Sequence, residues 1–416
     1  PEAAGTWPVT WAEDDATRAA LRARLAEALS AEGQRLDALA LSGTAAQVWI
    51  ANDRFPSPAA AAGRIARTMA RLLPPSVERF EITLTTGGLP RSTLVLSRRD
   101  LETLETRPDR AEALLARAAV TTGAPVPAAA MLPDAYPRFD WRIGPDFRTS
   151  YFDPAQPLRY ELSAEAKASW ALSPSFTLAG MVSQRLDGDL HRARVSPSDD
   201  VPTVRTDWPE YYDRDRTRIE SLTAEWARKL GPSVFGRVSA GHLERMFSGV
   251  SGEVLWKPVD SRLALGAEVN YVQKRDPDSA FGLEDYDVLT GHASAYYEIG
   301  DGYAGQIDVG RYLAGDVGAT LTLRRRFQNG WSIGAFATLT DMSAEDFGEG
   351  SFDKGVMIRI PLIWATGTPT QAAVSRTIRP VQRDGGARLA VGGRLYGRVK
   401  GGDLFRYEEG WPLIWR

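Results

Sequence analysis

The chain has 416 residues, 50 basic and 53 acidic side chains, a formal net charge of −3 and no cysteine. The length allows more than one domain, the balanced charge gives no sign of a nucleic-acid partner, and the lack of cysteine excludes disulfides and thiolate metal sites. Mean hydropathy is −0.28 and no run of 18 apolar residues occurs, which excludes a transmembrane helix. Strands of a membrane barrel escape that test, because their apolar and polar residues alternate. The chain begins at Pro1 rather than Met, so we expect a processed or excised part of a longer protein.

Residues 1–122 combine predicted helices with short predicted strands. Leucines recur at i, i+4 within Asp14–Ser30, and Ser57 followed by Pro58 is typical of a helix start. Strand-like stretches lie at 36–41, 46–51, 80–85 and 92–96, and a further short helix at 99–106. The resulting order is α-β-β-α-β-β-α. This order predicts a small α/β domain with its helices on one face of a sheet. It contains no phosphate-binding loop, and we assign it no chemistry.

Residues 123–137 hold four prolines and several alanines, a composition typical of a semi-extended linker. From residue 138 to 416 the pattern is that of strands. In Leu263–Val272, for example, Leu265 and Val269 alternate with Glu268 and Asn270, so one face is apolar and the other polar. Twelve strands are predicted, at 140–151, 157–172, 174–187, 217–230, 233–243, 249–257, 261–274, 287–299, 302–312, 316–327, 330–342 and 353–365.

The predicted strands favour a membrane barrel over a soluble sandwich. Many match the ~9–11 residues that a tilted strand needs to cross a bilayer, and short turns alternate with long charged loops. Aromatic residues cluster beside the short turns, as in an interfacial belt: Trp170, Phe176, Phe235, Trp256, Tyr296, Tyr297, Tyr303, Phe327 and Trp331. We therefore predict a mostly β fold, an antiparallel transmembrane β-barrel of about 12 strands preceded by a small periplasmic α/β domain. A soluble β-sandwich adhesin is the alternative.

The polar face of such a barrel would line its lumen. The predicted lumen-lining residues are Glu268, Asn270, His292, Glu298, Gln306, Asp308, Thr320, Arg324 and Arg359. They could form ion pairs that fill the barrel, or line a path for a hydrated sugar chain. With about 12 strands the size favours a narrow or largely filled lumen. Trp411 and Trp415 are expected to anchor the C-terminus at the membrane interface.

We expect no catalytic site, metal site or cofactor. His191, His242 and His292 are scattered and lack metal-ligand spacing, and no Ser–His pair is evident in the sequence. The four carboxylates of the 343–354 loop (Glu345, Asp346, Glu349 and Asp353) are interpreted as a solvated loop rather than as a glycosidase pair.

Several segments resemble the YjbH family of outer-membrane proteins from exopolysaccharide and capsule gene clusters of Gram-negative bacteria. They include GVSGEVLWKP (249–258), LALGAEVNYVQKRD (263–276), DVLTGHASAYYE (287–298) and GRYLAGDVGATLTLRRRFQNGWSIGAFATLTD (310–341). Family members are usually longer, so the chain resembles their C-terminal part. The resemblance brings no active site and no agreed ligand residues.

The resemblance implies a role in exopolysaccharide production and export, as a translocation or assembly scaffold in the outer membrane with the α/β module in the periplasm. Its implied partners are outer-membrane lipids, an exopolysaccharide chain and companion periplasmic or lipoprotein components. Two alternatives stay open, namely a general porin-like diffusion channel and an outer-membrane hydrolase.

Overall fold

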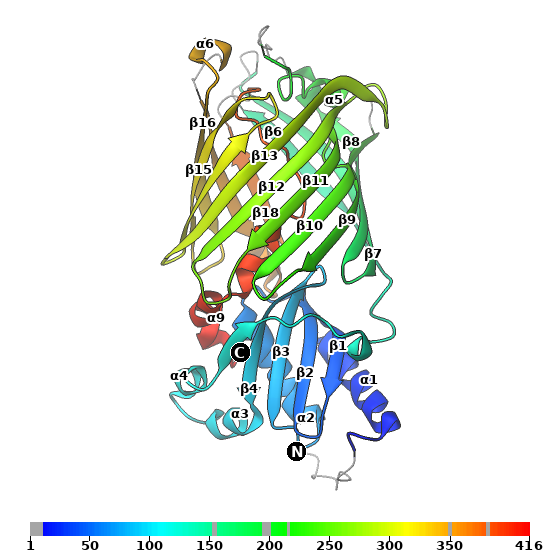
Figure 1. Ribbon diagram of the computed structural model, residues 1–416, viewed down its shortest axis with the longest axis vertical. Helices are drawn as coiled ribbons and strands as arrows, with labels where there is room; N and C mark the ends of the chain where they lie inside the picture. The colour runs from blue at the N-terminus through cyan, green and yellow to red at the C-terminus, as the bar shows by residue number, and fades with distance from the viewer. Residues whose placement is uncertain (1–10, 152–155, 194–200, 214–216, 348–351, 380–382) are drawn as a thin grey trace.

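The computed structural model describes residues 11–151, 156–193, 201–213, 217–347, 352–379 and 383–416. The chain forms an α/β unit, then a β-barrel stacked on it, and its last residues return to the α/β unit (Figure 1). Within the described ranges, no helix has both the length and the apolar character needed to span a membrane.

The α/β unit contains a five-stranded sheet in the order β1-β2-β3-β4-β5. Its elements are α1 (Asp15–Ala31), β1 (Gln34–Leu41), β2 (Ala45–Asn52), α2 (Pro58–Leu72), β3 (Arg79–Thr86), β4 (Leu89–Ser97), α3 (Arg98–Leu104), α4 (Arg110–Leu115) and β5 (Ala119–Thr122). The crossover through α2 makes β2 and β3 parallel, and the other neighbours are antiparallel. The short elements α4 and β5 are not among those predicted from the sequence.

Local chemistry explains where the two long helices begin. The Asp14 carboxylate accepts the backbone N–H groups of Ala16 and Thr17, and the Ser57 hydroxyl accepts that of Ala60. On α1, Leu21, Leu25 and Leu29 are buried against the sheet with the apolar side of α2. These contacts give the unit its own hydrophobic core.

The proline-rich segment 123–137 packs against the second face of this sheet. It includes η1 (Ala128–Ala130), and Ala130 is buried with Ala38 and Trp49. The Trp49 indole N–H donates to the carbonyl of Ala124 at 2.9 Å. This segment, predicted as a semi-extended linker, lies along the sheet and covers part of it.

In the described part of the chain the barrel is a single antiparallel sheet of thirteen strands in sequence order, one more than the predicted twelve. The strands are β6 (Arg138–Tyr151), β7 (Leu158–Ser173), β8 (Phe176–Gly188), β9 (Thr217–Lys229), β10 (Val234–His242), β11 (Phe247–Trp256), β12 (Leu263–Arg275), β13 (Leu283–Gly300), β14 (Tyr303–Arg311), β15 (Val317–Arg326), β16 (Ser332–Thr340), β17 (Asp353–Pro361) and β18 (Ala373–Ile378). Each predicted strand coincides with one of β6 to β17. The last prediction runs too far, because β17 ends at Pro361 and α7 (Ile363–Thr366) follows.

The odd strand number fixes how the barrel closes. Because each neighbour is antiparallel, β6 and β18 run in the same direction and meet at a parallel seam. Among the described residues no backbone pairing joins these two strands. The Arg376 guanidinium of β18 instead donates to the carbonyl oxygen of Phe147 on β6. The sheet is therefore a nearly closed barrel with one weakly joined seam.

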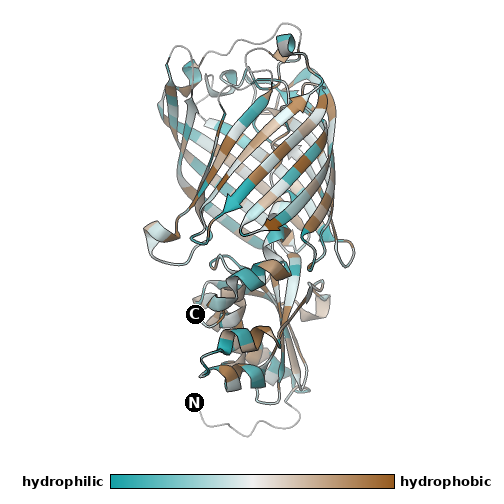
Figure 2. Cartoon of the chain, turned by 90° about the vertical axis from the view of Figure 1, so that its left-hand side faces the viewer, coloured by the Kyte–Doolittle hydropathy of each residue, from teal (hydrophilic) through white to brown (hydrophobic). Residues whose placement is uncertain are grey.

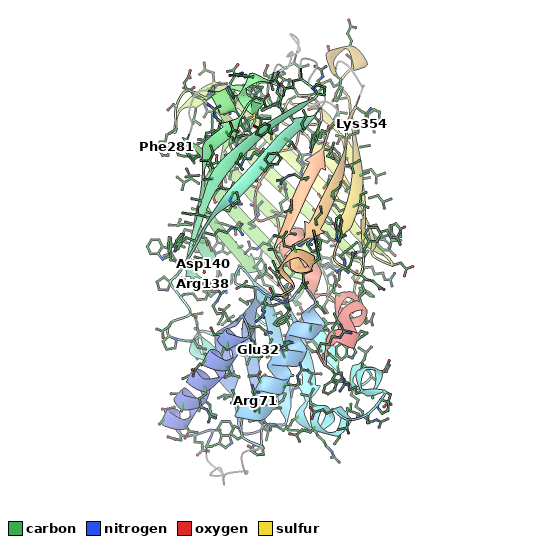
Figure 3. The ribbon with its side chains drawn as sticks, turned by 180° about the vertical axis from the view of Figure 1, so that it is seen from behind. Glu32, Arg71, Arg138, Asp140, Phe281 and Lys354 are labelled. Carbon is green, nitrogen blue, oxygen red and sulfur yellow. The ribbon has the colours of Figure 1, made fainter. Side chains whose placement is uncertain are left out.

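The two rims of the barrel differ. The rim that faces the α/β unit, here called the near rim, carries short turns, and its one longer described connection is 362–372 with α7. The longest connections, with α5 (Glu210–Asp213) and α6 (Ala344–Phe347), lie on the far rim (Figure 1). In Figure 3, Arg138 and Asp140 mark the near rim, and Phe281 and Lys354 lie toward the far rim. The chain thus enters the barrel beside the α/β unit.

The outer face of the barrel exposes apolar side chains along its strands, which alternate with polar ones (Figure 2). Val269 on β12, Ile307 on β14 and Leu321 on β15 are all exposed. Of the predicted aromatic belt, the exposed members are Trp170, Trp256, Tyr297, Phe327 and Trp331. Phe235 and Tyr296 were wrongly placed in the belt: they face inward and are only 2% and 5% exposed, because strand alternation and not proximity to a turn decides the face.

The final residues take a route that the sequence analysis did not predict. Residues 383–416, here called the tail, pass from the far rim through the lumen to the near rim and end on the α/β unit. The tail contains α8 (Leu395–Val399), η3 (Lys400–Gly402), α9 (Leu404–Gly410) and η4 (Trp411–Leu413). Trp411 is buried in the α/β core and its indole N–H donates to the carbonyl of Ala111 at 2.7 Å. The prediction of a membrane anchor is wrong for Trp411, because its partners are protein groups.

Candidate functional site

The lumen is the candidate functional site, and its walls are built to hold the tail. At the far rim the Asp384 carboxylate accepts the backbone N–H groups of Val204, Arg205 and Thr206, at 2.8, 2.6 and 3.0 Å. The backbone N–H of Leu313 donates to the carbonyl of Ala387 at 2.9 Å. Around these contacts lies an apolar cluster that includes Ala387 and Phe247. The tail is therefore fixed where it enters the barrel.

Glu268 of β12 is the electrostatic centre of the lumen. Its two carboxylate oxygens accept from the Arg394 guanidinium at 2.6 and 2.9 Å, a bidentate pair. Arg388 and Arg237 lie 3.6 and 3.7 Å away, and the amide of Asn270 donates at 3.2 Å. Glu268 is 4% exposed, so this charge is stable inside the barrel only because arginines surround it.

Two further carboxylates of the wall bind the α8 region. Glu253 of β11 accepts the backbone N–H of Leu395, the first residue of α8, at 3.1 and 3.0 Å, and the Arg237 guanidinium at 3.0 Å. Glu225 of β9 accepts from Arg398 at 2.6 Å. Arg398 also donates to the carbonyl of Gly87 in the α/β unit at 2.9 Å. One tail residue thus joins the barrel wall to the α/β unit.

At the near rim the tail, the barrel and the β3–β4 hairpin pack together. The rings of Tyr296 and Tyr396 stack with their centroids 3.8 Å apart, and Leu89 of β4 is buried in the same cluster. The hairpin approaches so closely that a Cβ on Gly88 would lie 1.9 Å from the carbonyl oxygen of Pro174. Gly88 also has φ +76°, a conformation that suits glycine. The α/β unit therefore packs directly against the base of the barrel at the β3–β4 hairpin.

The predicted lumen residues fall into three groups. Glu268, Asn270, His292, Glu298 and Asp308 are buried within the barrel. Gln306 and Thr320 are half-buried. The Gln306 amide donates to the Asp308 carboxylate at 2.7 Å, and the Thr320 hydroxyl contacts the Thr338 hydroxyl at 2.8 Å. Arg324 and Arg359 are exposed. All five buried residues belong to β12, β13 and β14, the part of the wall that the tail touches.

Among these residues His292 is an exception to the general pairing of polar groups. Its ring lies edge-on to Tyr312, with centroids 4.7 Å apart. Neither ring nitrogen has a hydrogen-bond partner among the described residues. In the structure this predicted lumen residue has an aromatic neighbour.

Three wall residues and the tail itself are not among the site residues predicted from the sequence. Arg237, Glu253 and Glu225 each face inward on strands that were correctly predicted. Strand alternation was the signal that could have found them. Val238 follows Arg237 and Val254 follows Glu253, and both valines point outward. No local pattern reveals the tail partners, because Glu268 and Arg394 are 126 residues apart in sequence.

Among the described residues, His242 and Ser248 form a Ser–His pair, with Nδ1 and Oγ 2.6 Å apart. These residues face each other across β10 and β11. Phe281 packs beside the imidazole, and Arg275 is its charged neighbour. No carboxylate bonds this ring in the described part of the chain, so the pair lacks the third member that would orient a base.

Other candidates for chemistry find structural partners. Asp353 of the 343–354 loop pairs with Arg379 at 2.7 Å, and Glu349 lies outside the described residues. The described ranges contain no group of three or more side chains arranged to hold a metal ion.

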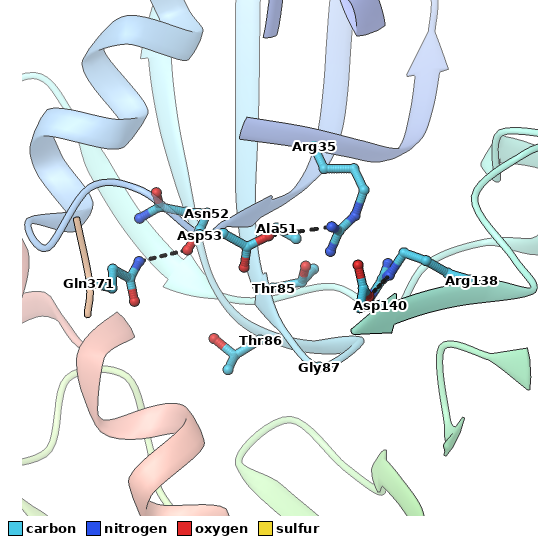
Figure 4. A pocket seen from close by; sticks show the side chains of 10 residues that line it. All are labelled: Arg35, Ala51, Asn52, Asp53, Thr85, Thr86, Gly87, Arg138, Asp140 and Gln371. Atoms are coloured by element: carbon cyan, nitrogen blue, oxygen red, sulfur yellow. Dashed lines mark hydrogen bonds and ion pairs between the residues drawn. The ribbon is translucent and has the colours of Figure 1, made fainter. Parts of the chain in front are cut away.

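A pocket of about 310 Å³ lies between the α/β unit and the near rim (Figure 4). It is lined by Arg35, Ala51, Asn52, Asp53, Thr85, Thr86, Gly87, Arg138, Asp140 and Gln371. Its charges are matched, with Arg35 3.3 Å from Asp53 and Arg138 2.9 Å from Asp140. The Gln371 amide donates to the carbonyl of Asn52 at 2.6 Å. The pocket is thus a polar junction between the two units.

Comparison with known proteins gives three similarities. The family model YjbH, described as "Exopolysaccharide biosynthesis protein YbjH", matches residues 3–401. The "Uncharacterized lipoprotein YjbH" of Escherichia coli (strain K12) is 36% identical over 267 residues, which cover 62% of this chain and 38% of that protein. The chain thus matches about two fifths of the length of this relative. The solved structure "Salmonella typhi OmpF complex with Daunomycin" matches with a TM-score of 0.29 and 10% identity, over 54% of this chain and 85% of that chain.

Proposed function

The chain belongs to the YjbH family of exopolysaccharide biosynthesis proteins, and from this membership we propose that it is an outer-membrane component of exopolysaccharide or capsule export in a Gram-negative bacterium. In this proposal the protein is a non-catalytic translocation or assembly scaffold. The barrel spans the membrane, and the α/β unit lies in the periplasm, where it docks companion components of the same pathway.

The observation that carries the proposal is the tail inside a charged lumen. Arg388, Arg394 and Arg398 bind carboxylates of the barrel wall, while the end of the same tail is buried in the α/β unit. A movement of the α/β unit would therefore pull on the segment that fills the barrel. This mechanical link suits a conduit or scaffold that companion proteins control from the periplasm.

The outer surface and the two rims support the proposed location. Exposed apolar side chains alternate with inward polar ones, which is the pattern of lipid-facing strands. Short turns face the periplasm in outer-membrane barrels, and here the near rim carries them. The α/β unit lies beside that rim (Figure 1).

The tail argues against the alternative of a general diffusion porin, because such a channel needs an open lumen. The hydrolase alternative has only the His242–Ser248 contact in its favour, and that pair has no orienting carboxylate among the described residues. Neither alternative uses the contacts between the tail and the α/β unit.

The direct test is to delete the gene in a strain that produces the polymer and to measure secreted polysaccharide. We expect secretion to fall, and to recover when the wild-type gene is returned on a plasmid. Unchanged secretion under producing conditions would refute the export role, even if the barrel is correct. Shortening of the cognate polymer by purified protein would instead favour the hydrolase.

A further inference from the structure

Three basic side chains at the near-rim end of the lumen have no carboxylate partner. They are Arg324 of β15, Arg359 of β17 and Lys400 of η3, here called the basic cluster. The Arg324 guanidinium lies 3.6 Å from the sulfur of Met357, and Arg359 donates to the carbonyl of Gln371 at 3.3 Å. The Lys400 ammonium lies 5.7 Å from the centre of the Tyr396 ring. No acidic oxygen among the described residues lies within 4.0 Å of these cations.

The basic cluster contrasts with the arginines between the tail and the β9–β14 wall. Those arginines each bind a carboxylate: Arg237 to Glu253, Arg388 to Asp308, Arg394 to Glu268, Arg398 to Glu225 and Arg406 to Glu298. Glu298 is the acidic neighbour of Lys400, but its oxygens already accept from Tyr396 at 3.1 Å and Arg406 at 2.8 Å. The positive charge of the basic cluster is thus left unmatched.

Solvent reaches the two arginines of the basic cluster, whereas Lys400 is half-buried. Arg324 and Arg359 belong to the inward-facing sets of β15 and β17, opposite the outward Leu323 and Val356. They are nevertheless exposed, whereas Glu268 and His292 on the wall that holds the tail are buried. The β15–β17 side of the lumen therefore contacts water near its base, and an anion could reach it.

The cations are also close to one another. Arg324 and Arg359 are both near enough to Lys400 for their charges to repel it. Between the two arginine-bearing strands, β16 presents Gly334, and a Cβ there would lie 2.7 Å from Cγ of Arg324. Arg324 thus lies across β16, toward the strand that carries Arg359. Unmatched like charges in a partly enclosed space attract anions strongly.

The basic cluster adjoins the pocket between the barrel and the α/β unit. The carbonyl that accepts from Arg359 belongs to Gln371, and Gln371 also lines that pocket (Figure 4). Polar side chains therefore continue from the junction of the two units to the cations inside the near rim.

We propose that Arg324, Arg359 and Lys400 form a binding site for the carboxylate groups of an acidic polysaccharide. Guanidinium groups bind carboxylates through paired hydrogen bonds, and the two arginines offer such groups on one side of the lumen. This inference rests on the proposed function for the kind of ligand, and it specifies a uronate-bearing chain rather than a neutral one.

The test uses the full chain in detergent micelles, with an oligogalacturonate as probe and a maltooligosaccharide of equal length as the neutral comparison. We expect the wild type to bind the acidic oligomer, with an affinity that falls steeply as sodium chloride is added. The double variant Arg324→Gln/Arg359→Gln should bind at least about tenfold more weakly, which corresponds to about 1.4 kcal/mol. The matched control is Arg228→Gln/Arg325→Gln, which removes the same charge from the outer face of β9 and β15.

Three results would overturn the proposal: no binding of the oligogalacturonate, equal affinity for both sugars, or an equal loss in the control variant. If the first double variant fails to fold, Lys400→Gln tests the same site from the tail and should also weaken binding. If the oligogalacturonate does not bind but the deletion strain has a secretion defect, this site is rejected and the export function is kept. Retained binding without any secretion defect would reject the export function but keep the site.

Discussion

At the scale of single residues, Glu268 has the largest electrostatic role in the lumen. Replacing it by Gln keeps the shape but leaves Arg394, Arg388 and Arg237 without their shared anion. Loss of one partner of a buried ion pair costs about 3 kcal/mol. We therefore expect Glu268→Gln to loosen the tail, with faster hydrogen exchange and easier proteolysis in residues 386–399. Asp285→Asn, an exposed carboxylate at the start of β13, is the control and should change neither.

Asp403 gives the tail a pH dependence. Its carboxylate accepts the backbone N–H of Arg406 at the start of α9, and Lys257 lies 3.4 Å away. Burial nevertheless raises the pKa of Asp403 from 3.8 to about 6. Because this pKa is higher in the folded state, the stabilisation is complete below about pH 4 and is lost as the pH rises through 6.

Docking of α9 should accordingly be firmer at pH 4.5 than at pH 7.5. Asp403→Asn keeps the helix cap, since Asn is an equally good N-cap residue, but removes this titration. Hydrogen exchange of α9, corrected for the intrinsic rate at each pH, measures the effect. A variant that keeps the wild-type pH dependence would contradict the assignment, and Asp134→Asn, an exposed carboxylate, serves as the control.

At the scale of elements, the tail decides between two forms of the proposed function. Translocation through the lumen requires the tail to move, whereas assembly on a fixed scaffold does not. The chain has no cysteine, so Leu313→Cys/Ala387→Cys would introduce a single disulfide beside the 2.9 Å backbone hydrogen bond at the far rim. We expect the oxidised protein to block secretion and a reductant to restore it, while each single variant secretes normally. Full secretion by the cross-linked protein would favour the fixed scaffold.

The same scale shows what the sequence could and could not predict. The two-residue period of apolar and polar residues located twelve of the thirteen barrel strands, because each strand has one apolar and one polar face whichever strands lie beside it. The thirteenth strand, β18, has only six residues, and its alternation could equally extend the strand before it. The tail has no two-residue period along its length. Its position depends on pairs such as Arg398 with Glu225, which are 173 residues apart. Phe235 and Tyr296 were misplaced because nearness to a turn was given more weight than strand phase.

At the scale of the whole molecule, the exposed apolar band predicts that the protein needs an amphiphile. The outward residues Leu321 and Leu339 are each 62% exposed, far more than a soluble sheet leaves on one continuous face. We expect the purified chain to aggregate in plain buffer, and in detergent to run on gels at a mobility that changes on heating. A protein that stays monomeric and folded without detergent would contradict the membrane-barrel interpretation.

The odd number of strands has a consequence for how this molecule is made. The first strand starts at the near rim, and thirteen strands that each run from one rim to the other end at the far rim. The last 34 residues must therefore come back through the interior of the barrel to reach the α/β unit. Threading α9 through a finished cylinder would be sterically difficult. The simpler order of events is that the wall curls around these residues and seals last where β6 and β18 meet, with the weak seam as the point of closure.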